Sequence, residues 1–236
     1  MTQGLSPTER DRLSGCLERL LPHVRLDSVA IAGGVGMQLG MARLGLQGVR
    51  DAVVDLDLVA ASIGAIKSTV AGQFLVSHYH VMRPAVPKFM IQLVDPVSRI
   101  RVDVFPDLVG SLLDARTIAI GEHSVQVLPL ERILEHKVLT LSRASQSAPI
   151  DPKHVHDARV LGDVLGRSVP SVATGALAPD VYGIEVDWSC ERCELSSDSS
   201  WPLAPKDRII ELLGWNRQPN IRLQPTAAGA IMSRRG

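Results

Sequence analysis

Short apolar runs alternate with helical patterns in the first half of the chain. Residues 28–32 (SVAIA) are short and apolar, as a buried strand is, and they lead directly into Gly33 and Gly34. The following residues place apolar side chains at helical spacing up to Gly45. The pattern therefore predicts one unit made of a strand, a glycine pair and a helix.

A second strand is predicted over residues 51–60 (DAVVDLDLVA). Because side chains alternate between the two faces of a strand, Leu56 and Leu58 share one face, and Asp55 and Asp57 share the other. Two carboxylates on one face of an otherwise apolar strand are unfavourable unless something compensates their charge.

Residues 89–105 predict a hairpin, with strands over 89–94 and 100–105, a turn at 95–98 and Asp103 in the middle of the second strand. Capping residues and apolar periodicity predict the remaining elements. These are helices over 7–21, 63–75, 129–143, 152–165 and 205–213, and a short strand at 124–127.

The expected fold class is α/β (α+β), with a small mixed sheet, flanking helices and a helical C-terminal part. We expect a core over residues 1–127, a helical C-terminal subdomain over 128–215 and a disordered tail over 216–236, where no periodic pattern is present.

Composition narrows the range of functions. The chain has 236 residues, 45% of them hydrophobic, which suffices for one core or for a core with a small subdomain. A formal net charge of +0 argues against general electrostatic binding of nucleic acid. Only 3% of the residues are aromatic, which argues against a surface on which the bases of single-stranded nucleic acid would stack. The cysteines (Cys16, Cys190 and Cys193), the lack of a secretory leader and the lack of a membrane-length apolar run predict a soluble, cytoplasmic protein.

Asp55 and Asp57 are the first candidates for chemistry. Their spacing in a strand puts their Cα atoms about 7 Å apart, where like charges repel unless a divalent cation lies between them. Mg²⁺ takes oxygen ligands, often carboxylates together with substrate phosphates. The alternative is an exposed edge strand with solvated acids.

Asp103 is the third candidate. A carboxylate on a neighbouring strand would complete a two-metal site, which clamps the attacking and leaving oxygens of an in-line displacement. The alternative is a structural acid paired with Arg101 or Arg99.

Two further features suit a phosphate group. Gly33 and Gly34 at the start of a helix let backbone N–H groups approach an anion, although an ordinary tight turn is the alternative. Lys137 lies within the apolar stripe of its helix, so it either reaches a buried anion or extends its ammonium to the edge of the stripe.

These motifs occur in the order AGG, VVDLDL, RVDVF, PLERILEHK and DPKHVHDARVL. The order resembles the DNA polymerase β-like nucleotidyltransferase superfamily, and within it the minimal toxins of the abortive-infection (type IV toxin–antitoxin) class. The resemblance covers about residues 28 to 165.

The resemblance implies a role for each matching residue. Asp55, Asp57 and Asp103 would be catalytic and bind metal, Mg²⁺ or Mn²⁺, and Gly33, Gly34 and Lys137 would bind a nucleoside triphosphate such as ATP. Asp157 matches an acid of the following helix. An antitoxin partner and a tRNA or protein acceptor are further implications of the toxin likeness.

The leading hypothesis is therefore a metal-dependent nucleotidyltransferase that moves a nucleoside monophosphate to an acceptor hydroxyl of RNA, protein or a small molecule. The alternative from another class is a catalytically silent module of the same fold that binds a nucleotide or a protein. A third is a zinc-linked interaction protein that combines Cys190 and Cys193 with His154 and His156, against the simpler interpretation of two ordinary thiols in a loop.

Overall fold

The chain divides into two compact units in a computed structural model. The first unit comprises Met1–Pro129 and Glu194–Leu213, and the second comprises Leu130–Cys193 and Gly214–Gly236. The structure describes residues 5–46, 52–53, 55–82, 88–144, 150–177, 201, 204–213, 221–226 and 229–234.

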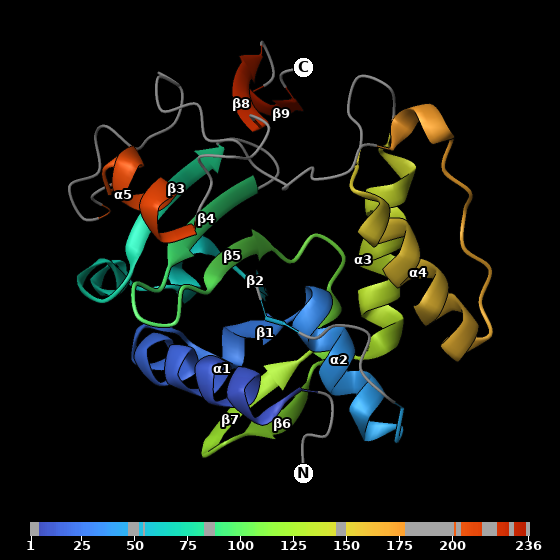
Figure 1. Ribbon diagram of the computed structural model, residues 1–236, viewed down its shortest axis with the longest axis horizontal. Helices are drawn as coiled ribbons and strands as arrows, with labels where there is room; N and C mark the ends of the chain where they lie inside the picture. The colour runs from blue at the N-terminus through green and yellow to red at the C-terminus, as the bar shows by residue number, and fades with distance from the viewer. Residues whose placement is uncertain are drawn as a thin grey trace. The chain divides into compact units, whose positions relative to one another are not determined.

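The first unit is built on a seven-stranded sheet with the strand order β3-β4-β5-β2-β1-β7-β6 (Figure 1). Its strands are β1 (Val29–Ile31), β2 (Asp55–Ala60), β3 (Leu75–Met82), β4 (Lys88–Val94), β5 (Arg101–Pro106), β6 (Arg116–Ile120) and β7 (His123–Val127). The pair β2/β5 and the pair β1/β7 are parallel, and the other neighbours are antiparallel. The expectation of a mixed sheet with helices is confirmed.

The first helix, α1 (Pro7–Leu20), begins where the sequence predicted. Ser6 is its N-cap and accepts a hydrogen bond from the backbone N–H of Glu9 at 3.2 Å. The Glu9 carboxylate does not return the contact to Ser6, because it accepts from the backbone N–H of Val53 at 2.6 Å and from Arg12. Glu9 thereby joins α1 to the chain just before β2.

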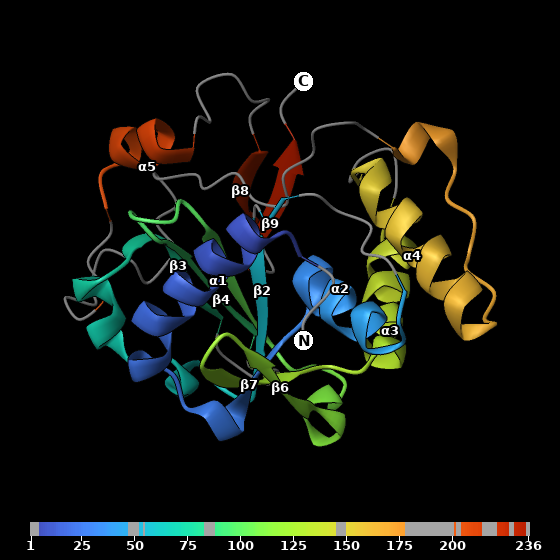
Figure 2. The same cartoon turned by 60° about the horizontal axis from the view of Figure 1, so that its bottom comes forward.

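The core of the first unit lies between α1 and the sheet. Figure 2 shows α1 crossing one face of the sheet. Leu17 and Leu20 of α1 line a small crevice together with Ile31, Leu58 and Val125 of the sheet. Since Asp55 and Asp57 alternate with Leu56 and Leu58 along β2, the two acids belong to the opposite face.

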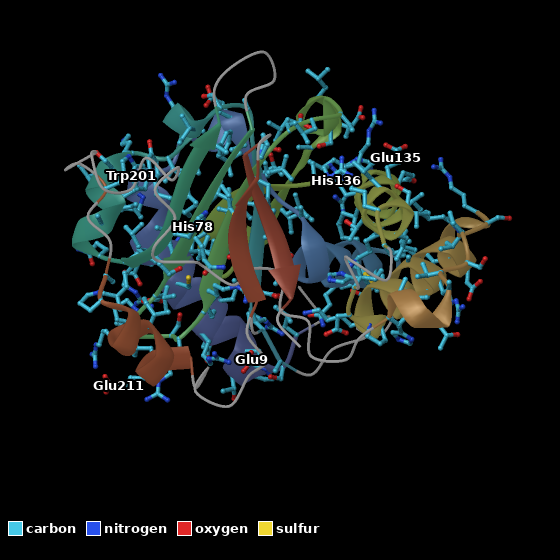
Figure 3. The ribbon with its side chains drawn as sticks, turned by 90° about the horizontal axis from the view of Figure 1, so that it is seen from above. Glu9, His78, Glu135, His136, Trp201 and Glu211 are labelled. Atoms are coloured by element: carbon cyan, nitrogen blue, oxygen red, sulfur yellow. The ribbon has the colours of Figure 1, made fainter. Side chains whose placement is uncertain are left out.

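Helix α2 (Gly33–Arg43) follows β1 after a single residue, Ala32. The predicted strand, glycine pair and helix therefore form as expected. Helix α5 (Lys206–Leu213) lies much later in the sequence but also belongs to the first unit, where it contacts β3. Trp201 stacks on Tyr79 of β3 with 4.9 Å between ring centroids, and Figure 3 shows Trp201 beside that strand.

The second unit contains the helices α3 (Leu130–Ser142) and α4 (Pro152–Leu165), which pack against each other. Asp151 caps α4 by accepting from the backbone N–H of Lys153 at 2.8 Å, and Gly166 ends the helix with a φ of 62°. This unit also contains a hairpin of β8 (Ile221–Thr226) and β9 (Gly229–Arg234). The sequence had shown no periodic pattern there, although Ile221 and Leu223 do alternate with polar residues.

Three further segments differ from the sequence-based expectation. Residues 63–75 form two short 3₁₀ turns, Ile63–Ala65 and Ser68–Gly72, and no α-helix, because Ile66 between them bridges to Val24. Strands β3 and β6 were not predicted. In β3 the buried residues include Ser77 and His78, so the apolar alternation that marks a strand is absent.

In the described part of the chain, no helix has both the length and the apolar character that crossing a membrane requires.

Candidate functional site

A row of polar residues crosses four adjacent strands of the sheet. In the parallel pair β2/β5, Asp57 is the register partner of Asp103, and Asp55 is the partner of Arg101. The row continues from Asp103 to Gln92 of β4, and from Gln92 to His78 of β3 (His78 is labelled in Figure 3). The parallel pairing of β2 with β5 therefore brings the three predicted carboxylates onto one face of neighbouring strands.

Arg101 connects two of the three carboxylates. Its Nε donates to Oδ2 of Asp103 at 2.8 Å, and its Nη2 donates to Oδ2 of Asp55 at 3.1 Å. Arg101 is buried, with 7% of its surface exposed. The ion pair between Asp103 and Arg101 that the alternative interpretation expected is present, and the same guanidinium reaches Asp55 as well.

Asp103 has a hydrogen-bond donor on each carboxylate oxygen. Besides Arg101 on Oδ2, the side-chain amide of Gln92 donates to Oδ1 at 3.0 Å. Gln92 is itself held by Ser77, whose hydroxyl donates to Oε1 of Gln92 at 2.8 Å. This chain of contacts fixes the orientation of the Asp103 carboxylate from the β3 side of the sheet.

Burial raises the pKa of Asp103 above its ordinary value, because an ionised carboxylate loses solvation in the protein interior. The positive charge of Arg101 opposes this shift, and the nearby Asp55 carboxylate adds to it. For Arg101, burial acts to lower the pKa, but the carboxylates of Asp103, Asp55 and Asp57 together hold the pKa above its usual range. The arginine therefore stays charged beside the acids.

Gly33 makes room for Asp57. A Cβ atom added at Gly33 would lie 1.7 Å from Oδ2 of Asp57, and the φ of Gly33 is +57°, in the left-handed region that glycine tolerates best. The backbone also joins these segments, since the N–H of Ala32 donates to the Asp57 carbonyl at 2.8 Å. The start of α2 is thus held directly against the second carboxylate of β2.

Gly34 is buried in the first turn of α2. The N-cap of this helix, Ala32, makes no side-chain hydrogen bond to the first turn. The N–H groups of a helix start that lacks such a cap suit an anionic ligand.

Lys137 belongs to the second unit, where its Nζ donates to Oδ2 of Asp157 at 2.7 Å. Both side chains are buried, with 9% and 3% of their surfaces exposed. Lys137 does not extend to the surface, and its ammonium is not free. It forms a buried ion pair that joins α3 to α4. A phosphate role for Lys137 stays a prediction.

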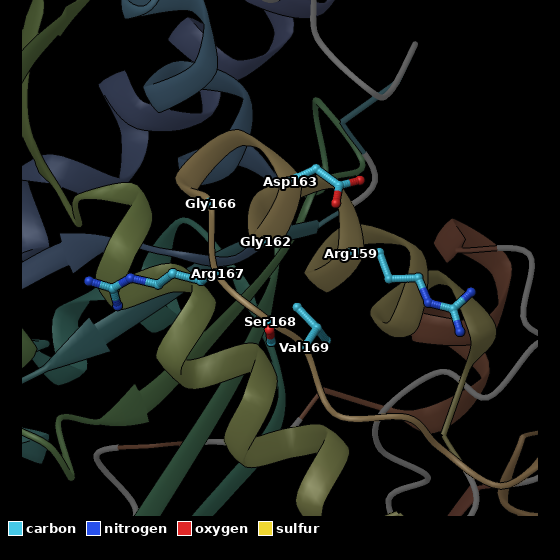
Figure 4. A pocket seen from close by; sticks show the side chains of 7 residues that line it. All are labelled: Arg159, Gly162, Asp163, Gly166, Arg167, Ser168 and Val169. Atoms are coloured by element: carbon cyan, nitrogen blue, oxygen red, sulfur yellow. The ribbon is translucent and has the colours of Figure 1, made fainter.

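The second unit also has a cavity of about 460 Å³ at the end of α4. Its lining includes Arg159, Gly162, Asp163 and Arg167. Figure 4 shows the side chains of Arg159 and Arg167 pointing away from each other, so their charges do not converge on one ligand. None of the predicted site residues lines this cavity.

Within the described residues, no group of three or more histidine, cysteine, aspartate or glutamate side chains is arranged to hold a metal ion. At the three carboxylates the positive charge is supplied by Arg101. Cys190 and Cys193 lie outside the described residues, so the zinc hypothesis built on them stays a hypothesis.

Two residues of the site were not singled out from the sequence as parts of it. Gln92 is the one polar residue in FMIQLV, and an isolated polar residue in an apolar strand was an available signal. Arg101 was considered only as a partner of Asp103. Its contact with Asp55 depends on the pairing of β2 with β5, which connects residues 46 positions apart.

Comparison with known proteins yields distant structural likenesses only. No protein-family model matches the sequence, and no curated protein matches it closely enough to count as a relative. JHP933 from Helicobacter pylori is 12% identical, with 68% of each chain covered and a TM-score of 0.38.

Two further structures have nucleotidyltransferase names. An antigenic nucleotidyltransferase-like protein from Paracoccidioides brasiliensis is 18% identical, with 71% of this chain and 80% of that chain covered and a TM-score of 0.38. A proposed nucleotidyltransferase from Thermotoga maritima is 19% identical, with 69% and 95% covered and a TM-score of 0.40. Likenesses this distant say nothing about which reaction, if any, this chain catalyses.

Proposed function

We propose that this chain is a metal-dependent nucleotidyltransferase, which moves a nucleoside monophosphate from a nucleoside triphosphate to an acceptor hydroxyl. The observation that carries the proposal is the register of β2 and β5, which makes Asp57 and Asp103 neighbours and leaves Asp55 one step along the same face. Three carboxylates on one face of two paired strands are unfavourable in a sheet that serves only as a scaffold.

The donor set fits Mg²⁺ or Mn²⁺ in its chemistry. Carboxylate oxygens are the ligands that these ions prefer, and Asp55 and Asp57 are only partly buried, so solvent and substrate can reach them. The missing side chain of Gly33 leaves the space that the Asp57 carboxylate occupies. A bound divalent ion would supply positive charge to the phosphate oxygens and to the attacking oxygen.

In the proposed reaction the acceptor hydroxyl oxygen forms a bond to the α-phosphorus of the triphosphate. The bond from that phosphorus to its bridging oxygen breaks, and pyrophosphate leaves with the electron pair. Asp103, the register partner of Asp57 on the paired strand, takes the hydroxyl proton. Gln92 and Arg101 hold that carboxylate in one orientation while it does so.

The start of α2 is the proposed place for the phosphates. The first-turn N–H groups at Gly33 and Gly34 have no side-chain cap from Ala32, and the positive end of a helix favours an anion. The Asp57 carboxylate beside Gly33 would repel a phosphate group, so we expect triphosphate binding at this helix start to require the divalent ion.

The finer assignments rest on the sequence resemblance alone. They are the toxin class, an antitoxin partner, and tRNA or a protein as the acceptor. Transfer to a candidate acceptor is tested once nucleotide binding has been established.

Isothermal titration with each nucleoside triphosphate, with and without Mg²⁺, tests the proposal together with the variant Asp57→Asn. We expect binding that requires Mg²⁺ and that the variant loses, while circular dichroism shows an unchanged fold. Incubation with α-³²P-labelled triphosphate and candidate acceptors then reports transfer. If Asp57→Asn kept full Mg²⁺-dependent binding and transfer, the assignment of these acids would be wrong.

Lys137 is tested in the same titration. We propose that its ammonium contacts phosphate, and we expect Lys137→Gln to weaken triphosphate binding by about tenfold, the effect of losing one charged hydrogen bond. Asp157→Asn is the matched control, because it removes the observed partner of Lys137 and keeps the ammonium. Equal losses in both variants would mean that the pair has only a structural role in the second unit.

A catalytically silent binding module is the second candidate, and one observation favours it. Arg101 offsets the charge of Asp55 and Asp103, so these acids persist in the fold without a metal ion. Triphosphate binding without transfer to any acceptor would favour this candidate, whereas labelled product would exclude it.

A further inference from the structure

Arg101 contacts carboxylates of both strands of the site. It lies on β5, two residues before Asp103, and it is the register partner of Asp55 on β2. Its guanidinium donates to Oδ2 of both acids. Two carboxylates on different strands are therefore drawn together by one positive group.

We propose that the guanidinium of Arg101 is the resident counter-ion of this site: it holds Asp55 and Asp103 together while no divalent cation is bound, and it releases Asp55 when one binds. The inference rests on the proposed function, because it takes the three acids to be the metal site. It assigns to Arg101 the role of a positioning residue that sets the affinity for metal.

The arrangement of charges favours such an exchange. One guanidinium faces three carboxylates, and Asp55 and Asp57 are partly exposed, so an incoming cation can reach them. A divalent ion among the same oxygens would approach Arg101 closely, and like charges repel strongly where little water separates them. Metal and guanidinium therefore compete for the carboxylate oxygens.

The geometry shows which contact would be released. The bond to Asp55 is the longer of the two, at 3.1 Å against 2.8 Å for the bond to Asp103. The side chain of Asp55 is also the more exposed, at 13% against 5% for Asp103. A released Asp55 carboxylate would thus face solvent and an incoming ion.

Asp103 stays in place during this exchange. Gln92 donates to its second oxygen, and Ser77 holds Gln92. The third acid therefore does not depend on Arg101 alone for its orientation.

The test measures Mn²⁺ binding without nucleotide, by titration followed with electron paramagnetic resonance, and the shift in melting temperature that Mn²⁺ causes. In Arg101→Gln we expect a lower melting temperature without metal, a larger Mn²⁺-induced shift than in the wild type, and Mn²⁺ affinity about tenfold tighter, because a competing charge is gone.

Arg19→Gln is the matched control. Arg19 also forms an ion pair with a buried aspartate, Asp95, in the first unit but outside the carboxylate row. We expect this variant to lower the melting temperature and to leave the Mn²⁺-induced shift as in the wild type. A variant that merely weakens the fold would behave in this way.

Arg101→Lys provides a second variant in case Arg101→Gln does not fold. Lysine keeps the charge but lacks the planar group that spans two carboxylates, so we expect a smaller gain in Mn²⁺ affinity. Mn²⁺ affinity in Arg101→Lys equal to or weaker than in the wild type, or in Arg101→Gln no tighter than in the wild type, would overturn the inference.

The outcome is separate from that of the proposed function. Tighter Mn²⁺ binding in Arg101→Gln without nucleotide transfer by the wild type would support the counter-ion and count against the enzyme. Transfer by the wild type with unchanged Mn²⁺ affinity in Arg101→Gln would support the enzyme and reject the counter-ion.

Discussion

Gly33 is the residue on which the position of Asp57 most directly depends. Gly33 has no Cβ atom, and the Asp57 carboxylate occupies the space where one would lie. The φ of Gly33, +57°, also suits a residue without a side chain. We expect Gly33→Ala to lower the free energy of unfolding by about 3 kcal/mol, from backbone strain together with displacement of Asp57. Urea unfolding measures this change, and titration with Mn²⁺ should show that metal binding is weakened.

Gly110→Ala separates strain from displacement. Gly110 also has a positive φ, +68°, but a Cβ atom there would meet nothing within 4 Å. We expect this variant to cost about 1 kcal/mol, the strain alone, and to keep Mn²⁺ binding. Equal costs in the two variants would mean that the contact between Gly33 and Asp57 contributes nothing.

At the scale of elements, Asp95 ties α1 to the turn between β4 and β5. Arg19 of α1 donates to both oxygens of Asp95, with 3.1 Å between Nε and Oδ1, and Ser98 and the backbone of Val97 donate as well. Burial acts to raise the pKa of Asp95, but these hydrogen bonds hold it below its ordinary value of 3.8. The ionised form is therefore stabilised by folding.

This shift predicts a defined dependence of stability on pH. A lowered pKa contributes stability above the unfolded value of 3.8, and the contribution is lost as the pH falls through the folded pKa. We expect Asp95→Asn to cost about 2 kcal/mol at neutral pH and progressively less below pH 3.8. Urea unfolding over a pH series measures the difference, and a difference independent of pH would contradict the assignment.

Trp201, which lies in the second stretch of the first unit (Glu194–Leu213), packs against β3. Its ring stacks on Tyr79 with an interplanar angle of 17°, and the N–H of Ala204 donates to the Val76 carbonyl at 2.9 Å. Trp201 and Ala204 thus contact β3, which is the edge strand of the sheet, and an uncovered edge strand presents unpaired backbone groups.

We expect Trp201→Ala to lower the free energy of unfolding by about 3 kcal/mol, because a large buried ring is removed from Tyr79. Trp201→Phe keeps an aromatic ring in place and should lose less than half as much. Hydrogen exchange should show faster exchange in β3 for the alanine variant. If exchange in β3 were unchanged, the segment would not protect that edge.

For the whole molecule, the sequence predicted the elements whose signals are local. The hairpin of β4 and β5 was found because Asp95 and Pro96 mark its turn, and α4 because Asp151 and Pro152 mark its start. Strand β3 was missed because its buried polar residues, Ser77 and His78, remove the apolar alternation. Local patterns identify an element only when its buried face is apolar.

The sequence predicted the acids of the candidate site, but it did not predict that Arg101 would neutralise part of their charge. Asp55 and Asp57 share a face because of their spacing, which the sequence contains. The contact of Arg101 with Asp55 depends on β5 pairing in parallel with β2, a long-range choice that no local pattern encodes. Only the folded structure therefore shows how Asp55 and Asp103 are stabilised without a metal ion, through their ion pairs with Arg101.

The balance of charge over the whole chain leads to a last prediction, on the acceptor. Lysine and arginine number 25, and aspartate and glutamate also number 25, so no excess of positive charge is available for phosphate backbones. We expect micromolar protein to cause no mobility shift of bulk tRNA in about 150 mM salt, and at most a slight shift in about 50 mM salt. Micromolar protein is chosen because ordinary non-specific binding falls in that range. A basic nucleic-acid-binding protein of similar size is the positive control.

The result ranks the acceptors. Absence of a shift would put a protein or a small molecule ahead of RNA as the source of the hydroxyl, because an RNA substrate must first be held by its phosphates. A micromolar shift that weakens steeply with salt would contradict the prediction, since it requires several lysine or arginine contacts gathered on one surface. In that case tRNA would become the first acceptor to test with labelled nucleotide.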